Sequence, residues 1–210
     1  MHTKKSNPLE KISHRTLSHY ESVAQDFWEG TRDHDVTQNI DALLSALPRE
    51  KSLEILDFGC GPGRDLHLFK KLGHQPTGLD GCAAFCAMAT KYSGCQVLHQ
   101  DFLKLDLPQK KFHGIFANAS LFHIPSSHFT TVLKQLGNSL KTGGILFSSN
   151  PRGSGEGWNG DRYGYYVELE SYKAHLIDAG FKLLSHYYRP QGKPRNEQPW
   201  LATISQWSGE

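Results

Sequence analysis

The feature that most constrains the fold of this chain is a regular alternation of short apolar runs with amphipathic segments between residues 54 and 150. Short apolar runs favour strands buried on both faces, and apolar residues at helical spacing favour helices between them. The expected strands are 54–60, 75–80, 96–101, 112–118 and 144–150, and the expected helices are 62–72, 83–92 and one that begins at Ser126 or Ser127. Because this alternation needs a parallel sheet covered by helices on both faces, we expect an α/β protein with a doubly wound, Rossmann-like sheet.

The C-terminal part of the chain extends this sheet. Residues 167–179 predict a further helix, and residues 181–189 and 201–207 predict two strands that are antiparallel neighbours. The expected sheet therefore has seven strands, is mostly parallel, and has an antiparallel last strand.

The remaining segments are expected to flank the core. Helical patterns within residues 20–50 predict an N-terminal helical flap that acts as a lid. Residues 1–19 are polar and basic and are expected to be a flexible arm or linker, while the glycine-rich, aromatic residues 151–166 are expected to form a substrate loop. We expect residues 20–210 to be a single domain.

Composition excludes several classes of protein. The net charge of +2 comes from mixed charges, so the dense basic face of a nucleic-acid binder is not expected. No apolar run approaches the ~18–20 residues that span a bilayer, and residues 1–19 lack the apolar centre of a secretory signal. The four cysteines (Cys60, Cys82, Cys86 and Cys95) and the scattered histidines show no metal-binding spacing. We therefore expect a reduced, cytoplasmic protein with no metal and no nucleic-acid or membrane partner.

The first expected strand ends in a glycine-rich turn, Asp57-Phe-Gly-Cys-Gly-Pro-Gly63. Open parallel sheets bind ligands beyond the carboxyl ends of their strands, and alternate glycines let the backbone approach a ligand closely. The helix that follows would add free N–H donors suited to a carboxylate or phosphate, although a tight strand–helix turn without a ligand is the alternative interpretation. The dinucleotide fingerprint G-x-G-x-x-G fails, because its last glycine would fall on Arg64 or Leu66.

The pattern Asp-x-Gly-x-Gly-x-Gly resembles motif I of the class I S-adenosylmethionine-dependent methyltransferases. The resemblance implies S-adenosylmethionine as the cofactor and S-adenosylhomocysteine as the product, with the glycines beside the methionine part. It implies that Asp80 accepts hydrogen bonds from the ribose hydroxyls, that Asp101 and Phe102 surround the adenine, and that Asn118 lines the sulfonium side. The cofactor site implied in this way consists of Tyr20, Trp28, Asp57, Gly59, Gly61, Gly63, Asp80, Asp101, Phe102 and Asn118.

A narrower resemblance points to one branch of this family. Residues 20–36, 116–123, 147–153 and 187–190 are similar to the methyltransferase of ovothiol biosynthesis. This implies methyl transfer to the side-chain-proximal (π) imidazole nitrogen of 5-thiohistidine, which gives ovothiol A. In that family the domain is often fused behind an iron-dependent 5-histidylcysteine sulfoxide synthase, whose metal-binding histidine motif is absent here. We therefore expect a stand-alone form or an excised domain, with the synthase as a functional or fused partner.

The implied reaction suggests which residues bind the substrate. Methyl transfer is an in-line displacement, so the protein must hold the reacting atoms collinear, and an aromatic lid would exclude water. A substrate carboxylate needs a planar donor; Arg152 is the first candidate, Arg32 the second and Arg162 the third. The substrate-binding candidates are Phe27, Arg32, Asn150, Arg152, Trp158, Tyr163, Tyr165 and Tyr166, and the catalytic candidates are Asn118, Tyr166 and His123 as a proton acceptor.

Each of these assignments has a structural alternative. The aromatic rings can pack in the core, the arginines can be solvated loop residues, and a lone buried histidine can be structural. At the level of function, the alternatives are a methyltransferase for another small imidazole, amine or thiol, and a non-catalytic module that keeps the cofactor fold. A DNA methyltransferase is not expected, because Asn118-Ala-Ser replaces the Pro-Pro-Tyr/Phe or Pro-Cys motifs of those enzymes.

Overall fold

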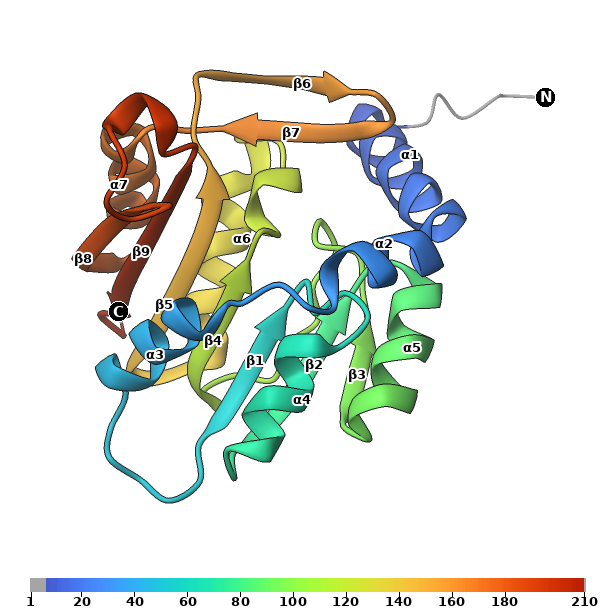
Figure 1. Cartoon of the computed structure of the whole chain (residues 1–210). Coiled ribbons are helices and arrows are strands. Elements are labelled where there is room, and N and C mark those ends of the chain that lie inside the picture. The colour runs from blue at the N-terminus through green and yellow to red at the C-terminus, as the bar shows by residue number, and fades with distance from the viewer. Residues whose placement is uncertain (1–6, 210) are drawn as a thin grey trace.

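The structure, a computed structural model, describes residues 7–209 and is built around one seven-stranded sheet (Figure 1). The sheet order is β3-β2-β1-β4-β5-β9-β8. The strands are β1 (Glu54–Phe58), β2 (Gln75–Asp80), β3 (Gln96–His99), β4 (Phe112–Asn118), β5 (Leu140–Pro151), β8 (Phe181–Arg189) and β9 (Trp200–Trp207). Strands β1 to β5 are parallel to one another, whereas β9 is antiparallel to both of its neighbours. The predicted fold class, including the antiparallel last strand, is confirmed.

Helices cover both faces of this sheet. The helices that pack on it are α3 (Thr37–Ala46), α4 (Arg64–Lys71), α5 (Ala83–Ser93), α6 (Ser126–Ser139) and α7 (Leu169–Asp178). Helices α3, α4 and α5 lie on one face, where Ile40 and Leu43 of α3 are fully buried against the sheet. Helices α6 and α7 lie on the other face, around the buried ring of Tyr172. The core is therefore two apolar layers separated by the sheet.

The α4–α5 pair explains one glycine of the motif. Gly63 is the residue before α4 and has a φ of 98°, in the left-handed region that favours glycine. A Cβ at Gly63 would lie 2.7 Å from the Cα of Ala89 in α5. Gly63 therefore allows the two helices to pack closely, and this structural role accounts for its presence without a ligand.

The expected flexible arm is wrong for residues 7–19. Helix α1 spans Pro8–Ser22, and residues 1–6 lie outside the described part of the chain. Asn7 caps the helix by accepting a hydrogen bond from the Leu9 amide at 3.1 Å, and proline at the first helical position favours this start. The helix has few apolar residues, so its sequence pattern is weak, and contacts with the rest of the protein hold it in place.

The segment expected as an irregular loop is also regular. Strand β5 continues through Pro151, and β6 (Gly155–Asn159) pairs antiparallel with β7 (Arg162–Tyr166) as a hairpin. The hairpin crosses above the sheet and reaches α1 (Figure 1). The alternation of apolar and polar side chains that indicates a strand is interrupted here, because Gly157 and Gly164, which pair with each other, have no side chains.

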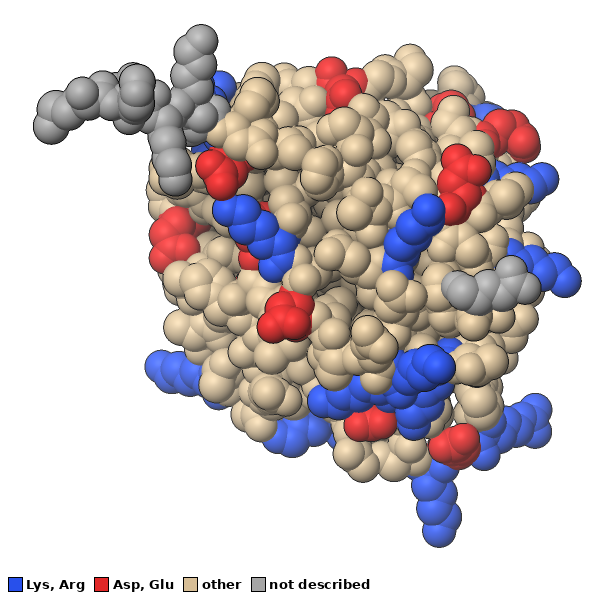
Figure 2. All heavy atoms as spheres, turned by 180° about the vertical axis from the view of Figure 1, so that it is seen from behind, with Lys and Arg blue, Asp and Glu red and all other residues tan. Residues whose placement is uncertain are grey.

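The helices expected within residues 20–50 are present, but they have different roles. Helix α2 (Ala24–Thr31) follows α1 directly and lies over the strand ends, whereas α3 is part of the core. On the face seen in Figure 2, acidic and basic side chains are interspersed, in keeping with a net charge of +2. All four cysteines are free thiols.

Candidate functional site

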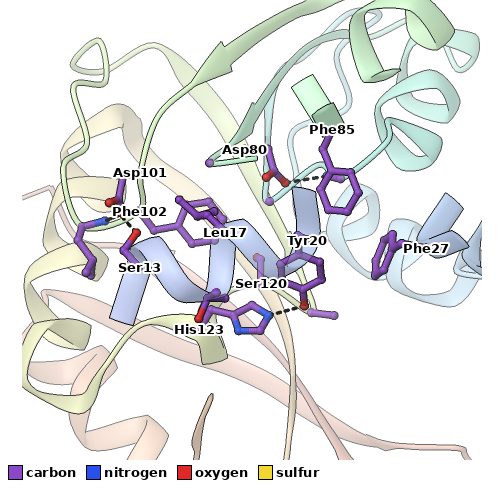
Figure 3. Close-up of a pocket in the computed structure, with 16 residues that line it drawn as sticks. Ser13, Leu17, Tyr20, Phe27, Asp80, Phe85, Asp101, Phe102, Ser120 and His123 are labelled. Carbon is purple, nitrogen blue, oxygen red and sulfur yellow. Dashed lines mark hydrogen bonds between the residues drawn. The ribbon is translucent and has the colours of Figure 1, made fainter. Parts of the chain in front are cut away.

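The carboxyl ends of the strands meet around a cavity that is partly open to solvent (Figure 3). Its floor is formed by the turn after β1, the end of β2 and the residues that follow β3 and β4, and its roof is α1. Six residues of the cofactor site expected from the sequence line it: Tyr20, Gly59, Gly61, Asp80, Asp101 and Phe102. The topology therefore brings together residues that are more than 80 positions apart in the chain.

Asp80 is the buried carboxylate of this cavity. One of its oxygens accepts a hydrogen bond from the Gly61 amide at 3.0 Å, and the other accepts one from the Cys82 amide at 2.9 Å. Burial raises the pKa of Asp80 to about 6, although these backbone hydrogen bonds lower it. Each carboxylate oxygen has further lone pairs, so Asp80 can accept additional hydrogen bonds from a ligand.

The glycine turn faces the cavity at two positions. Gly59 has a φ of 76°, and a Cβ there would overlap the Cβ of Ser120. Gly61 is more open, since a Cβ there would meet only the ring of Phe27, at 3.7 Å. The turn therefore closes tightly on one side and leaves backbone exposed to a ligand on the other.

Asp57 lies behind the turn and lines neither this cavity nor the cleft described below. Its side chain is 2% exposed, and its Oδ2 atom has no hydrogen-bond partner within the described residues. Burial and the nearby carboxylate of Asp65 hold the pKa of Asp57 well above its usual range. Asp57 and Gly63, both expected to contact the cofactor, thus support the turn from behind.

Of the α1 residues in the roof of the cavity, Tyr20 was expected from the sequence, whereas Ser13 and Leu17 were not. Ser13 of α1 donates a hydrogen bond to Asp101 at 2.7 Å, and Leu17 and Tyr20 point into the same space (Figure 3). Residues 13, 17 and 20 are spaced to share one face of a helix, and that spacing is the signal that was missed. Phe85 of α5 also lines the cavity and was not among the candidates.

His123 has both ring nitrogens engaged. Its Nδ1 lies 2.7 Å from the carbonyl oxygen of Tyr163, which can only accept, so Nδ1 carries the hydrogen. Its Nε2 therefore accepts a hydrogen bond from the Tyr20 hydroxyl, at 2.8 Å. Burial lowers the pKa of His123 to about 4. A neutral histidine without a free lone pair orients Tyr20, and the expected role as proton acceptor does not match this geometry.

A larger, open cleft adjoins the cavity and has a volume of about 690 Å³. The two spaces share five lining residues: Tyr20, Phe27, Gly59, Gly61 and Ala119. Trp28 and Asn118, both expected near the cofactor, line the cleft. Volumes of about 300–1,000 Å³ are typical of small-molecule sites. A ligand in the cavity would therefore extend into a cleft with room for a second small molecule.

Asn118 lies at the end of β4, and neighbouring side chains fix its orientation. Its oxygen accepts a hydrogen bond from Asn39 of α3 at 2.9 Å, and its amide nitrogen lies 3.4 Å from a carboxylate oxygen of Asp65. Asp65 in turn forms an ion pair with Arg64 at 2.6 Å. This network holds the Asn118 side chain in one position at the edge of the cleft.

The arginines are arranged differently from the expectation. Arg152 forms an ion pair with Glu168 at 3.1 Å and donates to the carbonyl of Gln198 at 2.7 Å, so its guanidinium is used structurally. Arg32 is exposed and pairs with Asp33. Neither residue lines the cavity or the cleft, whereas the third candidate, Arg162, lines the cleft together with Arg189, which was missed.

The remaining aromatic candidates divide between the site and the scaffold. Phe27 lines both spaces, and Tyr166 lies beside the cleft residue Phe122, with 6.3 Å between ring centroids. Tyr165 packs against Phe129 and its hydroxyl lies 2.9 Å from His175, so it belongs to the core. Trp158 is 42% exposed at the hairpin, under the guanidinium of Arg15.

Two further candidates lie outside both spaces. Tyr163 reaches the site through its backbone carbonyl, which holds His123. Asn150 is buried within β5, where its amide nitrogen lies 3.4 Å from the Ser148 hydroxyl. Sequence position placed both near the strand ends, but their side chains do not line the cavity or the cleft.

Neither a metal-binding cluster nor a membrane-spanning helix is found in residues 7–209. This part of the chain holds no group of three or more His, Cys, Asp or Glu side chains arranged to bind a metal ion. It also has no helix that is both long and apolar enough to cross a membrane.

Comparison with known sequences gives a match in the central part of the chain. Residues 55–144 match a family model described as a methyltransferase domain. Over 109 residues the chain is 31% identical to an uncharacterized methyltransferase of Mycobacterium tuberculosis, a match that covers 50% of this chain and 54% of that protein. The chain spans about half the length of the curated relatives it matches.

Comparison with solved structures gives matches over nearly the whole chain. The 1,6-didemethyltoxoflavin-N1-methyltransferase of Burkholderia thailandensis, with bound 1,6-didemethyltoxoflavin and S-adenosylhomocysteine, has a TM-score of 0.78 at 18% identity, covering 99% of this chain and 93% of that one. The [4+2]-cyclase SpnF has a TM-score of 0.73 at 16% identity, covering 93% and 96%. At such identities the likeness shows the fold alone.

Together, the domain match and the shared fold support the resemblance to class I S-adenosylmethionine-dependent methyltransferases. None of the proteins just described is named for 5-thiohistidine. The narrower resemblance to ovothiol biosynthesis stays a prediction.

Proposed function

We propose that this protein is an S-adenosylmethionine-dependent methyltransferase that modifies a small molecule. The observation that carries the proposal is the cavity under α1, in which the Asp80 carboxylate, the glycine turn and the Asp101–Phe102 pair face one space. These groups fit the cofactor: Asp80 can accept from ribose hydroxyls, Asp101 can accept from an adenine amino group, and the Phe102 ring offers an apolar face to the purine. The domain match over residues 55–144 supports the same conclusion.

The two adjoining spaces suit a transfer between two bound molecules. A cofactor with its adenosine in the cavity would extend its methionine part past Gly59 and Gly61 into the cleft, where the acceptor binds. When bound, S-adenosylmethionine supplies a methyl group activated for displacement. The protein's contribution is orientation and exclusion of water, because such a displacement gains most from collinear reacting atoms.

Several side chains at the junction can supply that contribution. Asn118 is held in one orientation by Asn39 and Asp65, so it can direct a bound acceptor. The ring of Phe27 lines the junction and that of Trp28 lines the cleft, where aromatic rings can exclude water and tolerate a sulfonium charge. His123 is neutral and engaged, so this mechanism does not use it as a base, and the acceptor nitrogen attacks in its unprotonated form.

For the acceptor we propose 5-thiohistidine, methylated on its π nitrogen. The support is the sequence resemblance over residues 20–36, 116–123, 147–153 and 187–190. The cleft agrees with this substrate in character, since Phe122 and Trp200 offer flat faces to an imidazole, and two arginines offer positive charge to a carboxylate. The same resemblance suggests the iron-dependent 5-histidylcysteine sulfoxide synthase as a functional or fused partner, and a cytoplasmic location.

An end-point assay tests both levels of this proposal. The protein is incubated with S-adenosylmethionine and either 5-thiohistidine or histidine, and products are read by mass spectrometry, with Asp80→Asn as the impaired control. A methyl mass gain on 5-thiohistidine supports the whole proposal; rejection of histidine is expected if a polar group in the cleft meets the sulfur.

The other outcomes separate the alternatives. If neither compound is methylated but S-adenosylhomocysteine raises the melting temperature, the 5-thiohistidine proposal fails and another imidazole, amine or thiol acceptor must be sought. If S-adenosylhomocysteine does not bind at all, the methyltransferase proposal itself fails. A non-methylating role is then favoured, as the shared fold of a [4+2]-cyclase illustrates.

A further inference from the structure

The cleft contains two arginines that form no ion pair within residues 7–209. We propose that Arg162 and Arg189 together bind a carboxylate of the substrate, so that the substrate class is a small aromatic acid. The inference rests on the proposed function and deepens it, since it specifies which end of the acceptor the protein recognises and with which residues.

Four of the eight arginines form ion pairs in the described part of the chain, and of the other four, Arg49 and Arg195 are exposed. Ion pairs engage Arg15 with Asp161, Arg32 with Asp33, Arg64 with Asp65, and Arg152 with Glu168. Arg162 and Arg189 have no such partner in the described part of the chain, yet both are half-buried and line the cleft. Asp35 also lines the cleft and is attracted to Arg189 without forming an ion pair with it. Partly desolvated guanidinium groups that no carboxylate pairs directly favour binding of an anion.

Arg162 lies in the cleft near Tyr20, a residue that lines both spaces. It lies on β7, and its guanidinium lowers the pKa of the Tyr20 phenol against the larger, raising effect of burial. Tyr20 is itself fixed, because its hydroxyl donates to His123 and His123 donates to the Tyr163 carbonyl. A guanidinium has five N–H donors, so Arg162 beside Tyr20 keeps donors for a ligand.

Arg189 reaches the cleft because of the sheet topology. Strand β9 is antiparallel to β5 and β8, so the last residue of β8 and the first residue of β9 lie at the edge where the parallel strands end. These two residues, Arg189 and Trp200, are paired in the ladder, and both line the cleft. The strand order thus places a cation and an indole ring side by side at the binding edge.

The chemistry favours a substrate carboxylate over the other anions available. Arg162 and Arg189 line only the larger cleft, away from the cavity assigned to adenosine. A carboxylate matches the planar fork of a guanidinium, and the aromatic side chains of Phe122, Trp200 and Trp28 surround the remaining space. Binding of the cofactor's own carboxylate by these arginines is the main rival, and it predicts a different kinetic result.

The test compares substrates that differ only in the carboxylate. Steady-state kinetics are measured with 5-thiohistidine and with its decarboxylated amine, for the wild type, Arg162→Gln and Arg189→Gln. We expect each variant to lower kcat/KM for 5-thiohistidine by about 10–100-fold, mainly through KM, and to change kcat/KM for the amine by less than about threefold. Arg32→Gln, at an exposed arginine outside the cleft, is the matched control and should change neither.

Affinity for S-adenosylhomocysteine, measured by calorimetry on the same variants, tests the rival explanation that the arginines bind the cofactor's carboxylate. We expect it to stay within about threefold of the wild type. If it falls as far as kcat/KM does, the arginines serve the cofactor and the inference is overturned. Equal losses for the acid and the amine would also overturn it, because the loss would then not depend on the carboxylate.

Failure of the proposed substrate is distinguishable from failure of this inference. If the wild type methylates neither compound, its complex with S-adenosylhomocysteine is titrated with matched pairs of small aromatic acids and amines, histidine with histamine and tryptophan with tryptamine. A preference for the acids that disappears in Arg162→Gln and Arg189→Gln supports the arginine site. If the wild type has no such preference, the inference is wrong whatever the acceptor.

Discussion

The two sides of the ligand site are built in different ways. We call the turn at residues 59–63 together with Asp80, Asp101, Phe102 and Asn118 the floor of the whole site, and α1, α2 and the β6–β7 hairpin the cover. The floor is held by buried strands and backbone hydrogen bonds, such as those from the Gly61 and Cys82 amides to Asp80. The cover is held by side chains, several of them at the surface.

The contacts of the cover are individually weak. Arg15 of α1 pairs with Asp161 of the hairpin, with side chains 51% and 59% exposed, and Lys104 pairs with Glu10, at 64% and 50%. Exposed pairs of this kind contribute about 0–1 kcal/mol each. Ligands enter proteins through the parts of lowest local stability, so the cover is expected to open while the floor stays fixed.

The largest effect is expected from Gly59→Ala in the floor. The alanine would be strained at a φ of 76°, and its Cβ would overlap Ser120, so the turn must move. We expect a loss of affinity for S-adenosylhomocysteine of more than about 100-fold by calorimetry, together with a lower melting temperature. Gly157→Ala in the hairpin is the control, since nothing lies within 4 Å of its Cβ position. Equal effects of the two substitutions would remove the distinction between floor and cover.

The next effect is expected from Asp80→Asn. The amide can still accept on one side but cannot receive two charge-assisted bonds, so affinity for S-adenosylhomocysteine should fall by about 10–100-fold. Asp106→Asn, at an exposed carboxylate, is the control. Retained affinity would mean that the cavity does not bind ribose through Asp80.

Asp80 also gives a pH dependence with a defined sign. Its pKa is raised from 3.8 to about 6 in the folded protein, so the folded state binds the proton more tightly. The contribution of Asp80 to the free energy of unfolding is therefore fully present below pH 3.8 and is lost as the pH rises through 6. Affinity for the cofactor should change in the opposite sense and fall below about pH 6, because a ligand hydroxyl needs the carboxylate as acceptor. Calorimetry at pH 5 and 7.5 should show this fall in the wild type, with no comparable fall in Asp80→Asn.

His123 lies between the strand ends and the cover and gives a pH dependence of stability with the opposite sign. Its pKa is lowered from 6.5 to about 4, so between these values the unfolded chain binds a proton that the folded protein does not. The contribution of neutral His123 to the free energy of unfolding, up to about 3 kcal/mol, is present above pH 6.5 and is lost as the pH falls toward 4. Urea unfolding at pH 7, 6 and 5 should show a flatter dependence for His123→Asn than for the wild type. The control His14→Asn should keep the wild-type slope, and a wild-type slope in His123→Asn would contradict the assignment.

The smallest effect is expected from Ser13→Ala in the cover. The hydroxyl donates to Asp101 at 2.7 Å, and its loss removes one contact between α1 and the floor side of the cavity. We expect a fall in affinity for S-adenosylhomocysteine of about three- to tenfold and faster hydrogen exchange in α1, with no change in exchange in β1 and β2. Ser18→Ala, on the exposed side of the same helix, is the control. Faster exchange in β1 would show that the two regions are not independent.

The contrast between floor and cover also explains what the sequence could predict. Strand ends in a parallel sheet lie at one edge whatever covers them, so Asp80, Asp101, Phe102 and Asn118 could be assigned to one site from their positions alone. Helix α1 was missed because its apolar pattern is weak and its contacts come from residues more than 80 positions away.

The prediction of which arginine binds the substrate does not match the structure, and the reason is geometric. Arg152 follows the end of β5 directly, but the chain there turns its guanidinium toward Glu168 and the Gln198 carbonyl. The strand-end argument also applies to Arg189. Because β9 is antiparallel to both β5 and β8, β8 ends at the binding edge, and its last residue, Arg189, lies there. The direction of a loop side chain depends on contacts across the fold, and no local pattern in the sequence reports them.

Helix α1 contacts both the cofactor cavity and the β6–β7 hairpin, and this affects the order in which the two substrates bind. On one side Ser13 bonds Asp101, and on the other side Thr16 accepts from the Tyr163 amide of the hairpin that carries Arg162. A cofactor that fixes the position of α1 when it binds would therefore also fix the position of the β6–β7 hairpin. We expect a compulsory sequence in which S-adenosylmethionine binds first and S-adenosylhomocysteine leaves last, so that the latter inhibits competitively against the former and non-competitively against the acceptor.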